Sequence, residues 1–166
     1  MRNDRLAAMI LALCDGRVIA RSMLNKFVYF TDMVALYRTG SILSGECYFK
    51  HPYGPMPISL EAMRRALVEQ GFLIETEHLG VGSMDHRYLT ADSANRVAIG
   101  YVLGADAVTL AGSVGTSLAA MPRRELSEAA HALSLWESAG MFEPIDLALA
   151  HDDVRQQTWL DAHITA

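Results

Sequence analysis

A rigid corner at residues 53–57, with the sequence Tyr-Gly-Pro-Met-Pro, constrains the fold of this chain more than any other segment. Gly54 can take backbone angles that other residues avoid, whereas Pro55 and Pro57 each fix φ and remove an N–H donor. We therefore predict a fixed elbow that delivers the chain into a helix starting at about residue 59. The corner follows an aromatic-rich helical run at 25–32, and the pair is more distinctive than either feature alone.

The composition is that of an ordinary globular protein. Of the 166 residues, 51% are hydrophobic and 20% are charged, and a chain of this length can bury a substantial core without metal or disulfide support. No apolar run approaches the ~20 residues needed to cross a bilayer, and no signal-peptide pattern is present. We expect a single domain over residues 1–166, a cytoplasmic location without membrane contact, and buried free thiols at Cys14 and Cys47.

Hydrophobic spacing predicts three helices in the first seventy residues. The first is expected at 4–16 and the second at 22–40. The second helix is apolar around so much of its circumference that we place it in the centre of the core. A short extended segment follows at 46–51, and the third helix is expected at 59–71.

The stretch after the third helix has the layout of a winged-helix core. Residues 72–77 alternate as a strand does, the sequence Gly-Val-Gly-Ser at 80–83 can turn the chain, and 84–89 can return as the partner strand. A further helix would then run to about residue 103. We therefore predict an α+β, mostly helical fold: a winged-helix-like core at 1–103 with one β-hairpin, followed by additional C-terminal helices.

Those additional helices occupy residues 104–166. A helix around 108–118 carries several small residues, which allow close helix approach, and Pro122 breaks it. The next helix is predicted over 126–140. A short helical turn is predicted at 144–149, opened by its proline.

A winged helix favours a DNA-binding hypothesis, but the charges argue against it. The third helix would be the recognition helix, and its Arg64 and Arg65 are balanced by Glu61 and Glu69. The expected wing has three acidic residues against Arg87, and the formal net charge is −5. Lys and Arg contacts to phosphate supply most non-specific affinity for DNA. A DNA-binding regulator that uses Arg64, Arg65 and Arg87 is therefore the alternative hypothesis. The simpler interpretation of Arg64 and Arg65 is a solvated helix face.

Catalytic and metal-binding patterns are absent from the sequence. None of the six histidines pairs at the i, i+4 spacing of a zinc-binding helix, and His151 beside two aspartates lacks a third ligand at a sensible spacing. No nucleophile elbow and no phosphate-cradling glycine loop occurs. We expect no enzymatic activity, no cofactor and no metal.

Asp32 is a charged residue within the aromatic helix. If it is buried, it must be paired or hydrogen-bonded, because an isolated carboxylate in the core is costly. The hydroxyl groups of Tyr29 and Tyr53 are candidate partners.

Three segments together carry a family resemblance. The helix at 24–32 contains Lys-x-x-Tyr-Phe, the corner at 53–57 follows it, and a Leu-Ala-Leu-Ala-His element ends at His151 and precedes Trp159. This combination resembles the Panacea domain, the family of SocA-like antitoxins and phage-associated proteins. The chain departs from the family at Ala148, where Ser is expected, and in the longer distance from His151 to Trp159.

The resemblance implies a protein that neutralises a toxin encoded by the adjacent gene through direct protein–protein contact, with protease or chaperone machinery as further partners. An acidic surface suits a basic toxin. A structural accessory that binds neither toxin nor DNA is a third hypothesis. Interface energy concentrates in aromatic and apolar side chains. The partner-binding or motif candidates are Tyr29, Phe30, Asp32, Tyr48, Phe49, Tyr53, Gly54, Pro55, Met56, Pro57, His151 and Trp159.

Overall fold

The computed structural model describes residues 3–78 and 87–165. The predicted turn at 80–83 and the first residues of the predicted return strand lie outside them. Along the chain the elements are α1 (Asp4–Cys14), β1 (Ile19–Ala20), the 3-10 helix η1 (Arg21–Met23), α2 (Leu24–Thr39), β2 (Tyr48–His51), β3 (Gly54–Pro57), α3 (Leu60–Glu69), β4 (Leu73–Glu77), β5 (Arg87–Ala91), the 3-10 helix η2 (Ser93–Asn95), α4 (Arg96–Leu103), α5 (Ala105–Ala119), α6 (Arg123–His131), α7 (Ser134–Ser138), β6 (Pro144–Ile145), the 3-10 helix η3 (Leu147–Asp152) and α8 (Val154–His163).

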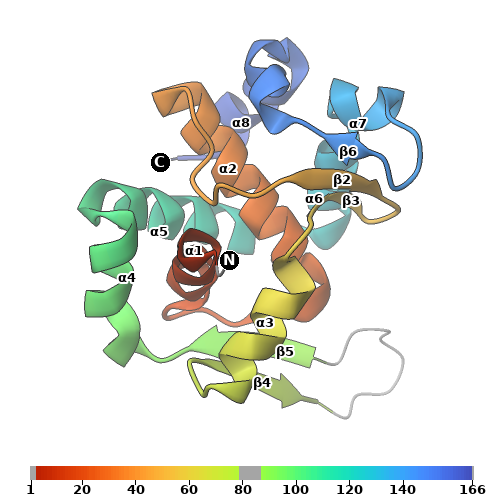
Figure 1. The fold of residues 1–166 in the computed structure, drawn as a ribbon. Coiled ribbons are helices and arrows are strands. Elements are labelled where there is room, and N and C mark those ends of the chain that lie inside the picture. Colours follow the sequence, from red (N-terminus) through yellow and green to blue (C-terminus); the bar gives the residue numbers. More distant parts are fainter. Residues whose placement is uncertain (1–2, 79–86, 166) are drawn as a thin grey trace.

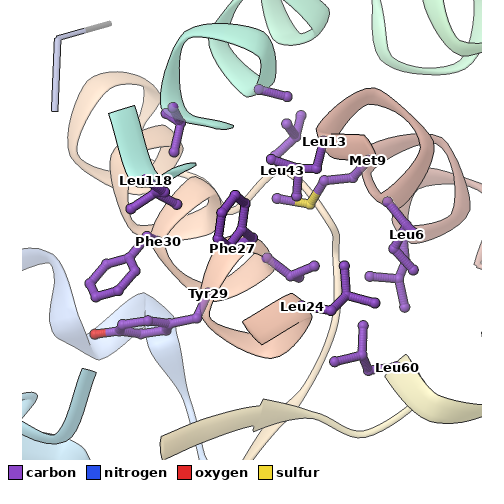
Figure 2. Packing of buried hydrophobic residues seen from close by; sticks show 14 of the residues in the cluster. Leu6, Met9, Leu13, Leu24, Phe27, Tyr29, Phe30, Leu43, Leu60 and Leu118 are labelled. Atoms are coloured by element: carbon purple, nitrogen blue, oxygen red, sulfur yellow. The ribbon is translucent and has the colours of Figure 1, made fainter. Parts of the chain in front are cut away.

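Helix α2 runs through the centre of the molecule, with α1, α4 and α5 on one side and the sheet of β2, β3 and β6 on the other (Figure 1). Every residue from Leu24 to Leu36 is buried, which confirms the predicted central helix. In Figure 2, Leu6, Met9 and Leu13 from α1 face α2, and Leu118 from α5 lies near Phe30. Each such side chain contributes roughly 1.5–3 kcal/mol when fully buried.

The first sheet has the strand order β1-β5-β4 and lies beside α3. Strands β4 and β5 pair antiparallel from Leu73↔Ala91 to Glu77↔Arg87, which confirms two paired strands after the third helix. The return strand ends at Ala91 rather than at residue 89. The winged-helix interpretation of this helix and hairpin stays a prediction, whereas the α+β class is confirmed.

The second sheet, with the order β3-β2-β6, corrects the prediction for the corner. Residues 54–57 are not an elbow into α3 but a strand, which pairs antiparallel with β2 from His51↔Gly54 to Tyr48↔Pro57. Lys50 pairs with Pro55. Since proline has no N–H, Pro55 and Pro57 must occupy positions that exchange no ladder hydrogen bonds. The hydrogen bonds between β2 and β3 are therefore all kept. The outer edge of β3 lacks the two N–H donors that Pro55 and Pro57 cannot supply.

The C-terminal predictions are right for α5 and wrong in two other places. The helix predicted at 126–140 is two helices, because Leu133 adopts an extended backbone (ψ 123°) that buries its side chain completely. The next residue, Ser134, donates its N–H to Asp153 Oδ2 over 2.8 Å, which stabilises the start of α7. The predicted helical turn at 144–149 begins as strand β6, since Ile145 pairs with Tyr48.

The two cysteines differ in environment. Cys14 is buried as predicted, and burial raises its pKa to about 12. Cys47 is exposed, so the prediction of a second buried thiol is wrong. No single helix of the described residues is long and apolar enough to cross a bilayer; α4 and α5 reach that length and composition only together, and they are bent by 113°.

Candidate partner-binding groove

Asp32 holds the loop before β2 against the central helix. Its carboxylate is fully buried and accepts hydrogen bonds from Ser44 N and Tyr48 OH, both over 2.7 Å, and from Ser44 Oγ. Burial raises the pKa of Asp32, and these hydrogen bonds oppose the rise. The predicted partners were wrong: Tyr29 OH donates instead to Gln156 Oε1 over 2.8 Å, and Tyr53 is exposed. Asp32 is a structural residue, out of reach of any partner.

The turn of the β2–β3 hairpin is fixed by side chains from three helices. Asn25 Nδ2 and Lys26 Nζ in α2 donate to the carbonyl of Tyr53 over 3.1 and 3.0 Å. His131 Nε2 in α6 lies 2.9 Å from the carbonyl oxygen of Pro52. Trp136 Nε1 in α7 donates to the carbonyl oxygen of His51 over 3.2 Å. Three consecutive carbonyls are thereby bound, and the Tyr53 side chain points out to solvent.

Lys26 makes this anchoring unusual. Its side chain is 4% exposed, and burial lowers its pKa to about 8. Gly54 shows how closely the hairpin lies against α6: a Cβ there would be 3.4 Å from Ala130 Cβ, and its φ of 102° suits glycine. The turn is held tightly on both sides.

A partly exposed cluster of four rings, Phe49, His51, Tyr53 and Phe142, lies on and beside this hairpin. The His51 ring lies at its centre, with ring centroids 5.8 Å from Phe49, 5.1 Å from Tyr53 and 6.2 Å from Phe142. Tyr53 is 65% exposed and Phe142 64% exposed. Burial and the charge of Lys26 lower the pKa of His51, which favours the neutral form of the ring.

Phe142 was missed in the sequence. It has a φ of 66°, in the left-handed region that a bulky residue rarely adopts. Its N–H donates to the carbonyl of Lys50 over 2.9 Å, which places its ring beside β2. A local sequence pattern gives no signal for this position, because it depends on the pairing of β6 with a distant strand.

A groove of about 970 Å³ runs beside the cluster. One wall is mostly apolar and comes from the hairpin and the residue after it: Phe49, His51, Tyr53, Met56, Pro57 and Ile58. The other wall is mostly polar or charged and comes from η1, α2, α3, β4 and β5. Arg123 joins the lining from α6, which packs against β3. Four of the predicted partner-binding or motif residues thus meet in one groove: Phe49, Tyr53, Met56 and Pro57.

Arg64 does not lie on a solvated helix face, and that interpretation is wrong. Its side chain is buried, its Nη2 lies 2.6 Å from Glu61 Oε1, and its Nη1 contacts Glu75. A phosphate contact would require breaking these pairs. Arg65 is exposed, and Arg87 Nη1 lies 3.6 Å from Glu75 Oε1. Nothing in this arrangement supports the DNA-binding alternative.

The remaining predicted residues lie in the core or outside the groove. Phe30 and Tyr48 are buried, and the Phe30 ring stacks on Trp159 at 4.8 Å. His151 is exposed, with its ring 6.1 Å from that of Tyr37. Neither His151 nor Trp159 lines the groove. Among residues 3–78 and 87–165, no three His, Cys, Asp or Glu side chains could together hold a metal ion.

Fold and site define a small α+β protein with an open groove beside a tightly anchored aromatic hairpin. Residues 24–137 match the family described as antitoxin SocA-like, Panacea domain, and the chain belongs to this family. No curated protein and no solved structure matches the chain. The resemblance found in the helix at 24–32 and the motif at 53–57 is thereby confirmed; the one at His151 and Trp159 falls outside the matched residues and stays a prediction.

Proposed function

We propose that this protein is an antitoxin that neutralises a cognate toxin by direct binding, and that the aromatic cluster and the adjacent groove contact the toxin. The family supports an antitoxin role in general. The observation that carries the choice of surface is a pair of large exposed rings: Tyr53, on a hairpin whose turn carbonyls are all bound, and Phe142, which lies beside strand β2 of that hairpin.

A rigid hairpin suits this role energetically. Binding costs free energy for every side chain and loop that must be ordered, and an anchored turn has little left to lose. Aromatic residues in a partly enclosed site are the usual anchors of protein interfaces. Left-handed backbone at a non-glycine residue costs of order 1–3 kcal/mol and tends to be retained at functional sites, which favours Phe142 as one of these anchors.

The remaining expectations belong to the same proposal. The toxin would be encoded by the adjacent gene, and the antitoxin would be a cytoplasmic, single-domain protein without enzymatic activity. Protease or chaperone machinery would be a further partner if neutralisation proceeds by degradation of the toxin.

The test is co-expression with the product of the adjacent gene. Wild type is expected to restore growth and to co-purify with the toxin, whereas Tyr53→Ser lowers the affinity about tenfold or more. Tyr101→Ser is the matched control, because Tyr101 is 93% exposed on α4 and does not line the groove. The proposal fails if the neighbouring product is not toxic, or if wild type neither rescues growth nor binds it.

A further inference from the structure

The groove has the opposite charge to the rest of the protein. The whole chain has a formal net charge of −5. The groove, by contrast, is lined by four arginines and two glutamates. The charged lining residues are Arg21, Arg64, Arg87, Arg123, Glu61 and Glu77.

The excess of positive charge persists when neighbouring carboxylates are included. Glu61 and Glu75 are shared among four guanidinium groups. Arg21 lies 3.5 Å from each of the two carboxylates, and Arg64 contacts both. Arg65 Nε lies 3.7 Å from Glu61, and Arg87 lies 3.6 Å from Glu75. With Glu77, which also lines the groove, three carboxylates stand against these four guanidinium groups, so a small excess of positive charge remains on this wall despite its ion pairs.

Arg123 adds a charge without a counterion. It is the first residue of α6, is exposed, and makes no hydrogen bond or ion pair with the described part of the chain. A helix N-terminus carries partial positive charge of its own. Arg123 therefore adds positive potential to the groove, separately from the shared carboxylates.

The opposite wall is apolar and incompletely covered. Ile58 is 60% exposed, and Met56 and Phe49 are half-buried beside it. A ligand that satisfied only the arginines would leave these side chains in water, and a purely apolar ligand would desolvate guanidinium groups without compensation.

Both walls are satisfied by one kind of occupant. We propose that the groove binds an acidic segment of the partner protein that carries at least one large apolar side chain, with its carboxylates toward Arg123 and the arginines of η1 and β5, and its apolar side chain against Phe49, Met56 and Ile58. The inference rests on the proposed function and names the chemistry of the bound segment. It reverses the expectation that an acidic protein meets a basic partner at its contact surface.

The inference is tested with a phage-displayed library of random dodecapeptides selected on the immobilised full chain. The enriched peptides are expected to carry two or more Asp or Glu residues around a Phe, Leu, Ile, Met, Tyr or Trp. The tightest is then labelled, and its binding is followed by fluorescence anisotropy at low and high salt. Affinity is expected to fall as salt rises, because the attraction at an open groove is screened.

Arg123→Glu and Arg124→Glu form the matched pair of variants. Both change the first turn of α6, where glutamate is compatible with the helix, but Arg124 does not line the groove and pairs with Glu128. Arg123→Glu is expected to weaken the selected peptide about tenfold and Arg124→Glu less than about twofold. Enrichment of basic or uncharged peptides, no enrichment, or equal affinities of the two variants would overturn the inference.

Two further outcomes separate the inference from the proposed function. A 20-base-pair DNA duplex that binds wild type and competes with the peptide would overturn the inference in favour of a nucleic-acid groove. If wild type neutralises the toxin and Arg123→Glu does so equally well, the inference fails while the antitoxin proposal stands. If the peptide results hold but no toxin is neutralised, the antitoxin proposal fails alone.

Discussion

Polar residues buried beside the central helix determine where the hairpin lies. Asp32 forms no ion pair with any residue in 3–78 and 87–165, and it accepts hydrogen bonds from Ser44 and Tyr48. Lys26, which also belongs to α2, donates a hydrogen bond from its ammonium group to the carbonyl oxygen of Tyr53 in the turn. Each is costly to bury alone, so each is stable only when the segment it binds is in place.

Tyr48→Phe is expected to lower the free energy of unfolding by about 1.5–3 kcal/mol, since the carboxylate of Asp32 loses a hydrogen bond while the ring keeps its packing. Urea denaturation measures the change. The same substitution at the exposed Tyr101 is expected to change stability by less than about 0.5 kcal/mol. Equal effects at the two positions would contradict the structural role given to Asp32.

Lys26→Met is expected to change how stability depends on pH. The pKa of Lys26 is 10.5 in its unperturbed state and about 8 in the folded protein. Between these values the unfolded chain binds a proton that the folded protein has released, so wild-type stability rises with pH across this window. The variant lacks this contribution. The unfolding free energies of both proteins are measured at pH 7.5, 9 and 10.5. The free energy of wild type should rise relative to that of the variant as the pH increases. Parallel pH dependences would contradict the prediction.

At the level of elements, the β2–β3 hairpin shows what local sequence reasoning can and cannot establish. The rigidity of residues 53–57 was evident from glycine and proline, but a proline-rich strand and a proline-rich elbow have the same local pattern. Only the pairing with β2 decides between them. The central helix was predictable, because its own apolar residues cover most of its circumference. That pattern predicts burial without knowledge of the neighbouring elements.

Helix α5 also shows what a local sequence pattern leaves open. Its small residues were predicted to allow close helix approach, and part of that space holds a side chain instead. The Arg17 guanidinium lies 3.2 Å from where a Cβ of Gly115 would be, and Arg17 Nη2 donates to Thr116 Oγ1 over 2.9 Å. Small residues in the sequence indicate room, but not which group fills it.

Gly54→Ala is expected to destabilise the protein by about 1–3 kcal/mol, because alanine strains a φ of 102° and its Cβ meets Ala130. Gly100→Ala is the matched control. Gly100 lies inside α4 with nothing within 4 Å of an added Cβ, so alanine there should stabilise by about 0.5–1 kcal/mol. Thermal unfolding of the two variants should shift in opposite directions, and a shift in the same direction would count against the described hairpin geometry.

For the whole molecule, the candidate site depends on contacts between distant parts of the chain. The groove takes residues from η1, α2, the hairpin and the residue after it, α3, the β4–β5 pair and α6. Motifs in the sequence identified the hairpin residues, since they are concentrated there. Arg123 and Phe142 gave no signal, because each reaches the site only through the tertiary fold.

Phe142→Asn is expected to separate stability from partner binding. Asparagine tolerates a φ of 66° better than phenylalanine does, so the free energy of unfolding should stay the same or rise by up to about 1 kcal/mol. Co-purification of the toxin should fall, because an exposed aromatic anchor is lost. Met141→Asn, which changes an exposed neighbour without positive φ, controls for the backbone effect. A large loss of stability in Phe142→Asn alone would show that its ring serves the fold.

Strand β2 has a further consequence for the timing of synthesis. Its second partner, β6, pairs with it at Tyr48↔Ile145 and Phe49↔Pro144, and the chain between them needs roughly 5–20 s to be made at ribosomal rates of about 5–20 residues per second. Until then the nascent chain has an unpaired strand edge and lacks the ring of Phe142. Each newly made molecule should thus pass through an interval in which it is open to proteases and unable to bind its partner.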